Sequence, residues 1–174
     1  MTGKSITLHA RSEEETIALG MKFGSLLKAG DVVAMTGTLA AGKTTFTKGI
    51  AKALGIEDMV TSPTFCLISE YEGKKFPLYH IDVYRLEGAE DFLNLGVEDM
   101  LYGKGVCVIE WSEKVESCLP KKTIRMTFTP NEDGSREISV ENWNNGPLES
   151  LAENLERLEN PIEGSEKSLK GSIE

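Results

Sequence analysis

The residues best suited to chemistry form a glycine-containing run, Gly37-Thr38-Leu39-Ala40-Ala41-Gly42-Lys43-Thr44. This run fits the pattern G-x-x-x-x-G-K-[ST], which is typical of a phosphate-binding loop. Glycine lets the backbone turn tightly, so that successive N–H groups and the start of a following helix point at an anion. In such a loop the Lys43 ammonium reaches the β- and γ-phosphate oxygens, and the Thr44 hydroxyl binds Mg²⁺. The run predicts nucleotide binding, but by itself it does not distinguish ATP from GTP or hydrolysis from transfer.

A site of this kind needs a second Mg²⁺ ligand, commonly an acid at the end of a neighbouring apolar strand. Glu110 follows the apolar residues 106–109, and Asp82 follows residues 78–81. For either acid, the alternative is a strand-end carboxylate that faces solvent. Thr64 lies in the segment 61–65, where a threonine either senses the γ-phosphate through Mg²⁺ or belongs to an ordinary Ser-Pro turn. The chain has no N-K-x-D motif for reading guanine, which favours ATP.

Hydrophobic patterns predict the elements that position these residues. The first helix opens at Ser12, which has capping-box spacing to Glu15, and Gly30 is its expected C-cap. A second helix runs from Lys43 to about Leu54. A third helical region is broken at its central glycine. Strands are expected at 5–10, 31–37, 64–71, 76–82 and 106–111, the third helical region at 88–102, and an antiparallel hairpin at 123–129 and 136–142.

Composition limits the classes of protein that the chain can belong to. With 174 residues and a net charge of −9, the chain fits one compact acidic domain and is a poor non-specific binder of nucleic acid or anionic membrane. It has neither a stretch of about 20 apolar residues nor a signal-peptide core. Three widely spaced cysteines, Cys66, Cys107 and Cys118, form no C-x-x-C pair. We therefore expect a cytoplasmic protein with reduced thiols and no membrane contact.

The character of the chain changes after Trp143, so we expect a P-loop domain over 1–146 and an acidic tail over 147–174. The tail begins with an amphipathic helix and ends in a polar segment. Its leucines recur at helical spacing, and this stripe packs either on the chain's own domain or on a partner. They are Leu148, Leu151, Leu155 and Leu158.

Four motifs in order, GTLAAGKTT (37–45), SPTF (62–65), HIDVYRL (80–86) and IEW (109–111), resemble those of the TsaE family, also called YjeE. The resemblance covers about residues 5–143. It implies a three-layer α/β domain of the P-loop NTPase type with a mixed, mainly parallel sheet, to which the chain adds its C-terminal antiparallel hairpin. It also implies slow, Mg²⁺-dependent hydrolysis of ATP to ADP and phosphate. Members act with TsaB and TsaD to form the threonylcarbamoyl group on adenosine 37 of tRNA, so the link to tRNA is indirect.

The resemblance also implies roles for individual residues. Lys43 and the backbone of 37–45, through Thr45, hold the phosphates. Thr44 and Glu110 bind Mg²⁺, Asp82 orients water or completes the metal shell, and Thr64 is a switch residue. Trp111 borders the site, and the start of the Ser12 helix lies near the adenine, with Ser12 or Thr16 in contact. The roles of the signature residues His80, Tyr84 and Arg85 stay open. For His80, a purely structural role in its strand is at least as well supported as a chemical one.

Two features depart from the family pattern or leave alternatives. The family loop reads G-D-L-G-A-G-K-T, whereas this chain has Thr38 and Ala40 at the second and fourth positions. If the loop needs a positive φ at position 40, alanine costs about 1 kcal/mol or more. No arginine finger is evident near the loop, which favours slow turnover in isolation. A nucleotide-gated adaptor with incidental turnover and a small-molecule kinase are the alternative functions.

Overall fold

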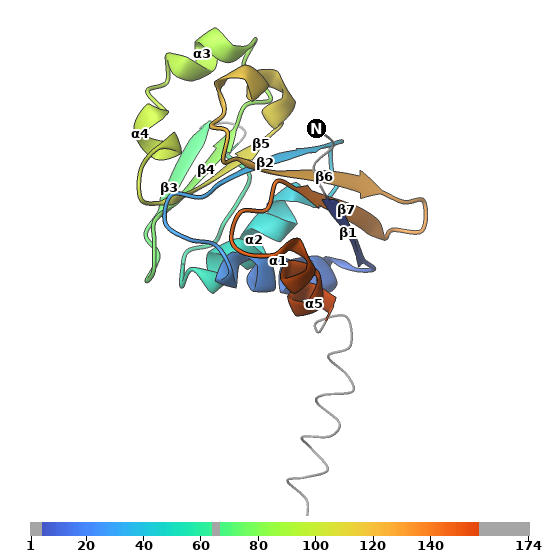
Figure 1. Cartoon of the computed structure of the whole chain (residues 1–174). Helices are drawn as coiled ribbons and strands as arrows, with labels where there is room; N and C mark the ends of the chain where they lie inside the picture. Colours follow the sequence, from blue (N-terminus) through green and yellow to red (C-terminus); the bar gives the residue numbers. More distant parts are fainter. Residues whose placement is uncertain (1–4, 64–66, 157–174) are drawn as a thin grey trace, which may run out of the picture.

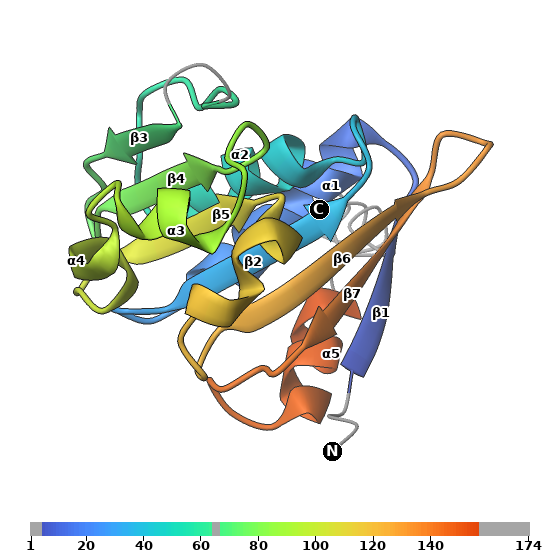
Figure 2. The same cartoon turned by 90° about the horizontal axis from the view of Figure 1, so that it is seen from above.

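The structure, a computed structural model, describes residues 5–63 and 67–156. Within these ranges a single sheet runs through the molecule in the strand order β1-β7-β6-β2-β5-β4-β3 (Figures 1 and 2). The strands are β1 (Ser5–Ala10), β2 (Val32–Gly37), β3 (Ile68–Tyr71), β4 (Leu78–Asp82), β5 (Val106–Glu110), β6 (Ile124–Pro130) and β7 (Arg136–Glu141). The central pairs β6–β2, β2–β5 and β5–β4 are parallel, whereas β1–β7, β7–β6 and β4–β3 are antiparallel. The mixed sheet and the expected C-terminal hairpin, β6–β7, are both confirmed.

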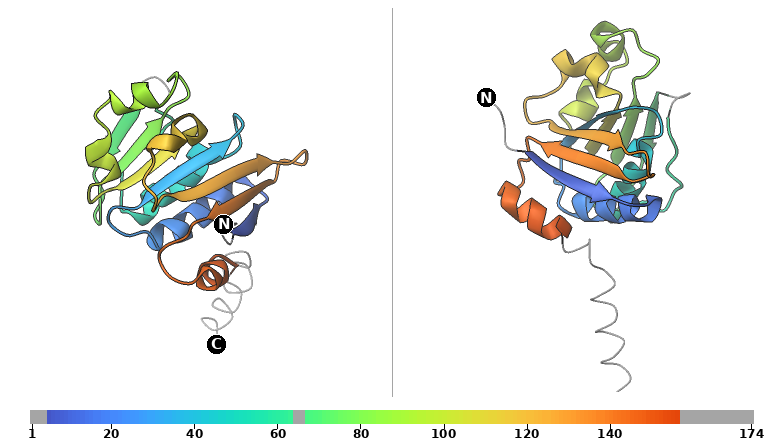
Figure 3. Two further views of the ribbon diagram at one scale, coloured as in Figure 1. Left: turned by 45° about the horizontal axis from the view of Figure 1, so that its top comes forward. Right: turned by 90° about the vertical axis from the view of Figure 1, so that its right-hand side faces the viewer.

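Helices cover both faces of the sheet (Figures 1 and 3). One face carries α1 (Glu13–Ser25), α2 (Lys43–Ala53) and α5 (Leu148–Glu156), and the other carries α3 (Ala89–Leu93), α4 (Glu98–Leu101) and the 3₁₀ helix η1 (Ser112–Cys118). A separate cluster of buried apolar side chains lies on each face. The protein therefore has the three-layer α/β fold that the sequence predicts.

Strand β5 shows how the sheet positions the acids. Val106 and Val108 belong to the core on the α2 side, whereas Cys107 and Ile109 belong to the opposite core. A strand covered on both faces is apolar throughout, as central parallel strands usually are. Because side chains alternate along a strand, Glu110 continues the series of Val106 and Val108 and faces α2.

Two glycines let α1 and α2 pack at very short distance. A Cβ atom at Gly20 would lie 2.2 Å from the Phe46 carbonyl oxygen, and one at Gly49 would lie 2.2 Å from the carbonyl oxygen of Ile17. Next to this crossing, the rings of Phe23 and Phe46 pack 5.4 Å apart. The close contact fixes the middle of α1 against the helix that follows the glycine-rich loop.

Several expected boundaries differ from those in the structure. Helix α1 ends at Ser25 with Leu26 as its cap, so the prediction that Gly30 caps it is wrong. Leu27 stays buried outside the helix, and apolar periodicity cannot separate a buried turn residue from one more helical turn. The expected strand 106–111 stops at Glu110, because Trp111 has a φ of 62°. Strand β3 begins at Ile68, and residues 64–66 of the expected strand lie outside the described residues.

Helix α5 packs on the domain from which it extends. Leu151 and Leu155 are buried in the core that α1, α2 and β1 share, and Leu148 packs against it half-buried. Leu158, the last member of the predicted stripe, lies outside the described residues. Among the residues that the structure describes, no helix has the length and apolar character needed to cross a membrane.

Candidate functional site

The glycine-rich loop links the end of β2 to the start of α2. It uses positive φ angles at Gly37 (144°), Ala40 (62°) and Gly42 (102°). Gly42 is the N-cap of α2 and has no side chain, so the first N–H groups of the helix face outward for a ligand. The loop therefore does require a left-handed backbone at Ala40, the position where the family pattern has glycine.

The loop borders a cavity of about 500 Å³. Of the expected site residues, Leu39, Ala40, Ala41, Gly42, Lys43, Thr44, Thr45, Asp82, Glu110 and Trp111 line it. Gly37, Thr38 and Ser12 are not among its lining residues, although Gly37 contacts Lys43 through its carbonyl. Thr64 lies outside the described residues.

Lys43 is buried at the floor of this cavity, with 4% of its surface exposed. Its Nζ donates to the Gly37 carbonyl at 2.5 Å and lies 3.7 Å from the centre of the Trp111 ring, which attracts cations. Burial lowers the pKa of Lys43, and the nearby carboxylate of Glu110 opposes this shift. A poorly hydrated ammonium held at the loop is suited to exchange its carbonyl contact for phosphate oxygens.

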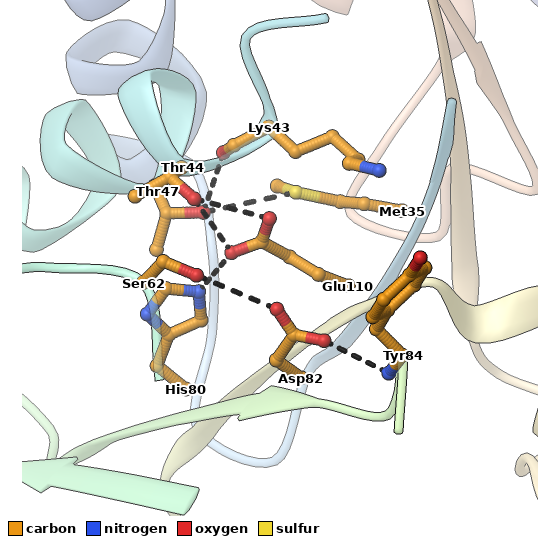
Figure 4. Close-up of polar contacts among 9 residues, drawn as sticks. All are labelled: Met35, Lys43, Thr44, Thr47, Ser62, His80, Asp82, Tyr84 and Glu110. Atoms are coloured by element: carbon orange, nitrogen blue, oxygen red, sulfur yellow. Dashed lines mark hydrogen bonds and ion pairs between the residues drawn. The ribbon is translucent and has the colours of Figure 1, made fainter. Parts of the chain in front are cut away.

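Thr44 meets Glu110 across the start of α2 (Figure 4). The Thr44 hydroxyl lies 2.9 Å from one Glu110 carboxylate oxygen and 3.1 Å from the other. Asp82 pairs with Glu110 in the parallel register of β4 and β5, so both acids stand at the same edge of the sheet. Both residues are 3% exposed.

This set of donors fits Mg²⁺. The oxygens of Thr44, Glu110 and Asp82 are hard ligands of the kind that Mg²⁺ prefers. The described ranges hold no cluster of three or more His, Cys, Asp or Glu side chains able to form a complete metal cage. In nucleotide sites Mg²⁺ takes only one or two protein oxygens and completes its shell with phosphates and water. The arrangement thus suits a magnesium ion that arrives with a nucleotide.

The Asp82 carboxylate contacts two segments, the turn that follows β4 and the segment that precedes β3. One of its oxygens accepts a hydrogen bond of 2.9 Å from the Tyr84 N–H, and the other lies 3.4 Å from the Ser62 hydroxyl. Tyr84 and Ser62 also line the cavity, and the Tyr84 ring packs 4.8 Å from that of Trp111. Lys114 donates to the carbonyls of Tyr84 and Leu86 and so ties the turn that follows β4 to η1.

Two further lining residues escaped the sequence analysis. Arg136, the first residue of β7, packs so closely on the loop that a Cβ at Gly42 would lie 2.4 Å from its guanidinium nitrogen. Glu13 reaches the cavity from the first turn of α1. The sequence does not reveal that an arginine lies beside the loop, because β7 and the loop are distant in sequence and only the sheet order brings them together. Neither residue belongs to a motif that could have revealed it.

The start of α1 explains why Glu13 is in the cavity. The Ser12 hydroxyl accepts the Glu15 N–H at 3.1 Å and caps the helix, and Glu15 reaches back to the N–H of Arg11 at 2.7 Å. Thr16 is fully buried and donates to the Ser12 carbonyl. These bonds fix the first turn of α1, the turn that carries Glu13 to the cavity.

The parallel strands, the phosphate-type loop and the strand-end acid beside it define a P-loop α/β protein. The family model "Threonylcarbamoyl adenosine biosynthesis protein TsaE" matches residues 10–138. The chain belongs to the TsaE family.

Known proteins support the same assignment. The chain is 50% identical over 131 residues to a Treponema pallidum protein, covering 75% of this chain and 96% of the relative. It is 40% identical over 157 residues to a Bacillus subtilis protein, covering 90% and 98%. Both relatives are named tRNA threonylcarbamoyladenosine biosynthesis protein TsaE. The crystal structure of Bacillus subtilis YdiB superposes with a TM-score of 0.75 at 37% identity, covering 92% of this chain and 99% of YdiB.

Proposed function

We propose that this protein binds ATP with Mg²⁺ in the cavity beside the glycine-rich loop and hydrolyses it to ADP and phosphate. The observation that carries the proposal is the contact of 2.9 Å between the Thr44 hydroxyl and Glu110, with the buried Lys43 ammonium on the same loop. In P-loop hydrolases a hydroxyl and a carboxylate bind one Mg²⁺ ion, and a neighbouring lysine binds the phosphates.

The chain's own residues would act by positioning and by charge. The N–H groups of the loop and the Lys43 ammonium hold the β- and γ-phosphates, and Arg136 adds a second positive group to the cavity. Asp82 would orient the water that attacks the γ-phosphorus in line with the departing β-phosphate oxygen. Thr44 and Glu110 hold Mg²⁺, which when bound neutralises charge that develops on the phosphate oxygens.

We further propose that the activity serves tRNA threonylcarbamoyladenosine biosynthesis together with TsaB and TsaD. Family membership and the names of the relatives support this role. The net charge of −9 disfavours a broad nucleic-acid surface, which suits an indirect link to tRNA. Slow turnover in isolation stays a prediction. Whether Arg136, which lines the cavity, acts on the phosphates is tested by the same assay with Arg136→Ala.

The test is Mg²⁺-dependent ATP hydrolysis by the purified protein, alone and with purified TsaB and TsaD. We expect Lys43→Ala to reduce hydrolysis to background. Lys48→Ala, a lysine on α2 outside the lining of the cavity, is the matched control and should hydrolyse like the wild type. Wild-type hydrolysis by Lys43→Ala would reject the proposed site. Hydrolysis that does not change when both partners are added would reject the partnership but leave the ATPase.

A further inference from the structure

His80 is the buried side chain of the site for which the proposed chemistry gives no role. It lies on β4 two residues before Asp82, so both side chains project from the same face of the sheet. The His80 ring is fully buried, and its Nε2 lies 2.5 Å from a Glu110 carboxylate oxygen (Figure 4). The Glu110 carboxylate is therefore hydrogen-bonded by two elements, by Thr44 on α2 and by His80 on β4.

The direction of this hydrogen bond follows from the groups involved. An ionised carboxylate can only accept, so Nε2 carries the hydrogen. The other ring nitrogen, Nδ1, is buried and has no hydrogen-bond partner in the described segments. The hydrogen bond from Nε2 gives Glu110 one directed donor.

Glu110 needs such a donor because its surroundings offer a competing partner. Glutamate has a flexible side chain, and the buried Lys43 ammonium attracts the Glu110 carboxylate. If Glu110 turned to pair with Lys43, one movement would remove a metal ligand and a phosphate-binding cation together. In the structure Lys43 instead donates to Gly37, and Glu110 faces Thr44 and His80. The His80 hydrogen bond opposes that turn.

We propose that His80 is a positioning residue that fixes the Glu110 carboxylate for Mg²⁺ and keeps it apart from Lys43. This inference rests on the proposed nucleotide site. Residues that orient a metal ligand by hydrogen bonding typically change metal affinity by about 10- to 100-fold when they are replaced. Phosphate binding by the loop does not depend on the hydrogen bond between His80 and Glu110. Replacing His80 should therefore weaken metal binding and leave nucleotide binding without metal unchanged.

The experiment measures Mn²⁺, as a probe for Mg²⁺, binding to the protein–ADP complex by electron paramagnetic resonance. ADP affinity in EDTA is measured in parallel. In His80→Gln the side-chain amide nitrogen can replace Nε2 as donor, whereas the shorter side chain of His80→Asn cannot reach Glu110. Ile81→Val, a buried neighbour on β4 that faces the opposite core, controls for disturbance of the strand.

We expect His80→Asn to bind Mn²⁺ about 10- to 100-fold more weakly, with His80→Gln and Ile81→Val within about threefold of the wild type. ADP affinity in EDTA should be unchanged in all three variants. Wild-type Mn²⁺ affinity in His80→Asn would overturn the inference, and so would an equal loss of metal-free ADP binding, which marks general damage. A wild-type protein that binds no ADP under either condition would instead reject the proposed function.

A second measurement needs no variant. The chain has two histidines, and His9 is exposed on β1, so the imidazole ¹⁵N spectrum contains an internal reference. We expect His80 to show the Nε2–H tautomer, and its Nε2 resonance to move when Mg²⁺ is added to the ADP complex while that of His9 stays. An Nδ1–H tautomer, or a His80 signal indifferent to Mg²⁺, would contradict the inference.

Discussion

The left-handed backbone at Ala40 gives a prediction whose sign can be worked out from the structure. Ala40 is exposed and has a φ of 62°, so its methyl group contributes strain without burial. A left-handed conformation costs a residue with a Cβ about 1–2 kcal/mol. Replacement by glycine removes this strain. It also raises the conformational entropy of the unfolded chain, which lowers the free energy of unfolding by about 0.4–1 kcal/mol. Ala40→Gly should therefore raise the free energy of unfolding by about 1 kcal/mol.

The adjacent Ala41 provides a matched control. It is 1% exposed and packs in the core, and its φ is not positive. Ala41→Gly loses a buried methyl worth about 0.8 kcal/mol and gains the same unfolded-state entropy. It should therefore lower stability by about 1.5 kcal/mol. The same chemical change at neighbouring positions should act with opposite signs, with a difference of about 2.5 kcal/mol.

Urea denaturation and thermal melting of the two variants and the wild type test this reasoning. For a chain of this size 1 kcal/mol corresponds to about 2–4 °C in melting temperature. A rise for Ala40→Gly with a fall for Ala41→Gly confirms that the loop stores strain at position 40. If both variants melt below the wild type by similar amounts, the strain is absent and the argument from φ is wrong.

Three other perturbations follow from the same geometry. Gly20→Ala should lower the free energy of unfolding by about 2 kcal/mol in urea denaturation, because its Cβ would lie 2.2 Å from a backbone oxygen of α2; unaltered stability would mean that the helices separate freely. Burial raises the pKa of the Cys107 thiol to about 12 from 9.0, so the unfolded thiol ionises first and stability should fall as pH rises from about 9 to 12. Denaturation across that range should show a smaller fall for Cys107→Ala, and an identical slope would contradict the cause. Asp82→Asn should keep nucleotide affinity but lower the hydrolysis rate about 100-fold, whereas undiminished hydrolysis would exclude Asp82 from orienting water.

Local sequence signals were sufficient for the order and type of most elements and for most of the residues that line the cavity. The glycine and lysine spacing of 37–44 carries its own geometry, because a phosphate loop is built from consecutive residues. Strand-end acids were found for a similar reason. Asp82 and Glu110 each follow an apolar run, and parallel strands bring such ends to one edge of a sheet.

Tertiary structure decided the contacts between segments that no periodicity links. Arg136 reaches the loop only because β7 and β6 are added beside β2, and His80 meets Glu110 only through the register of β4 against β5. Glu13 lines the cavity only because α1 packs closely on α2, where glycines let the two helices cross. The backbone angle at Ala40 is likewise set by the loop's closure, against the preference of the residue itself. Sequence patterns record what a segment prefers by itself, whereas these features arise from which segments share a surface.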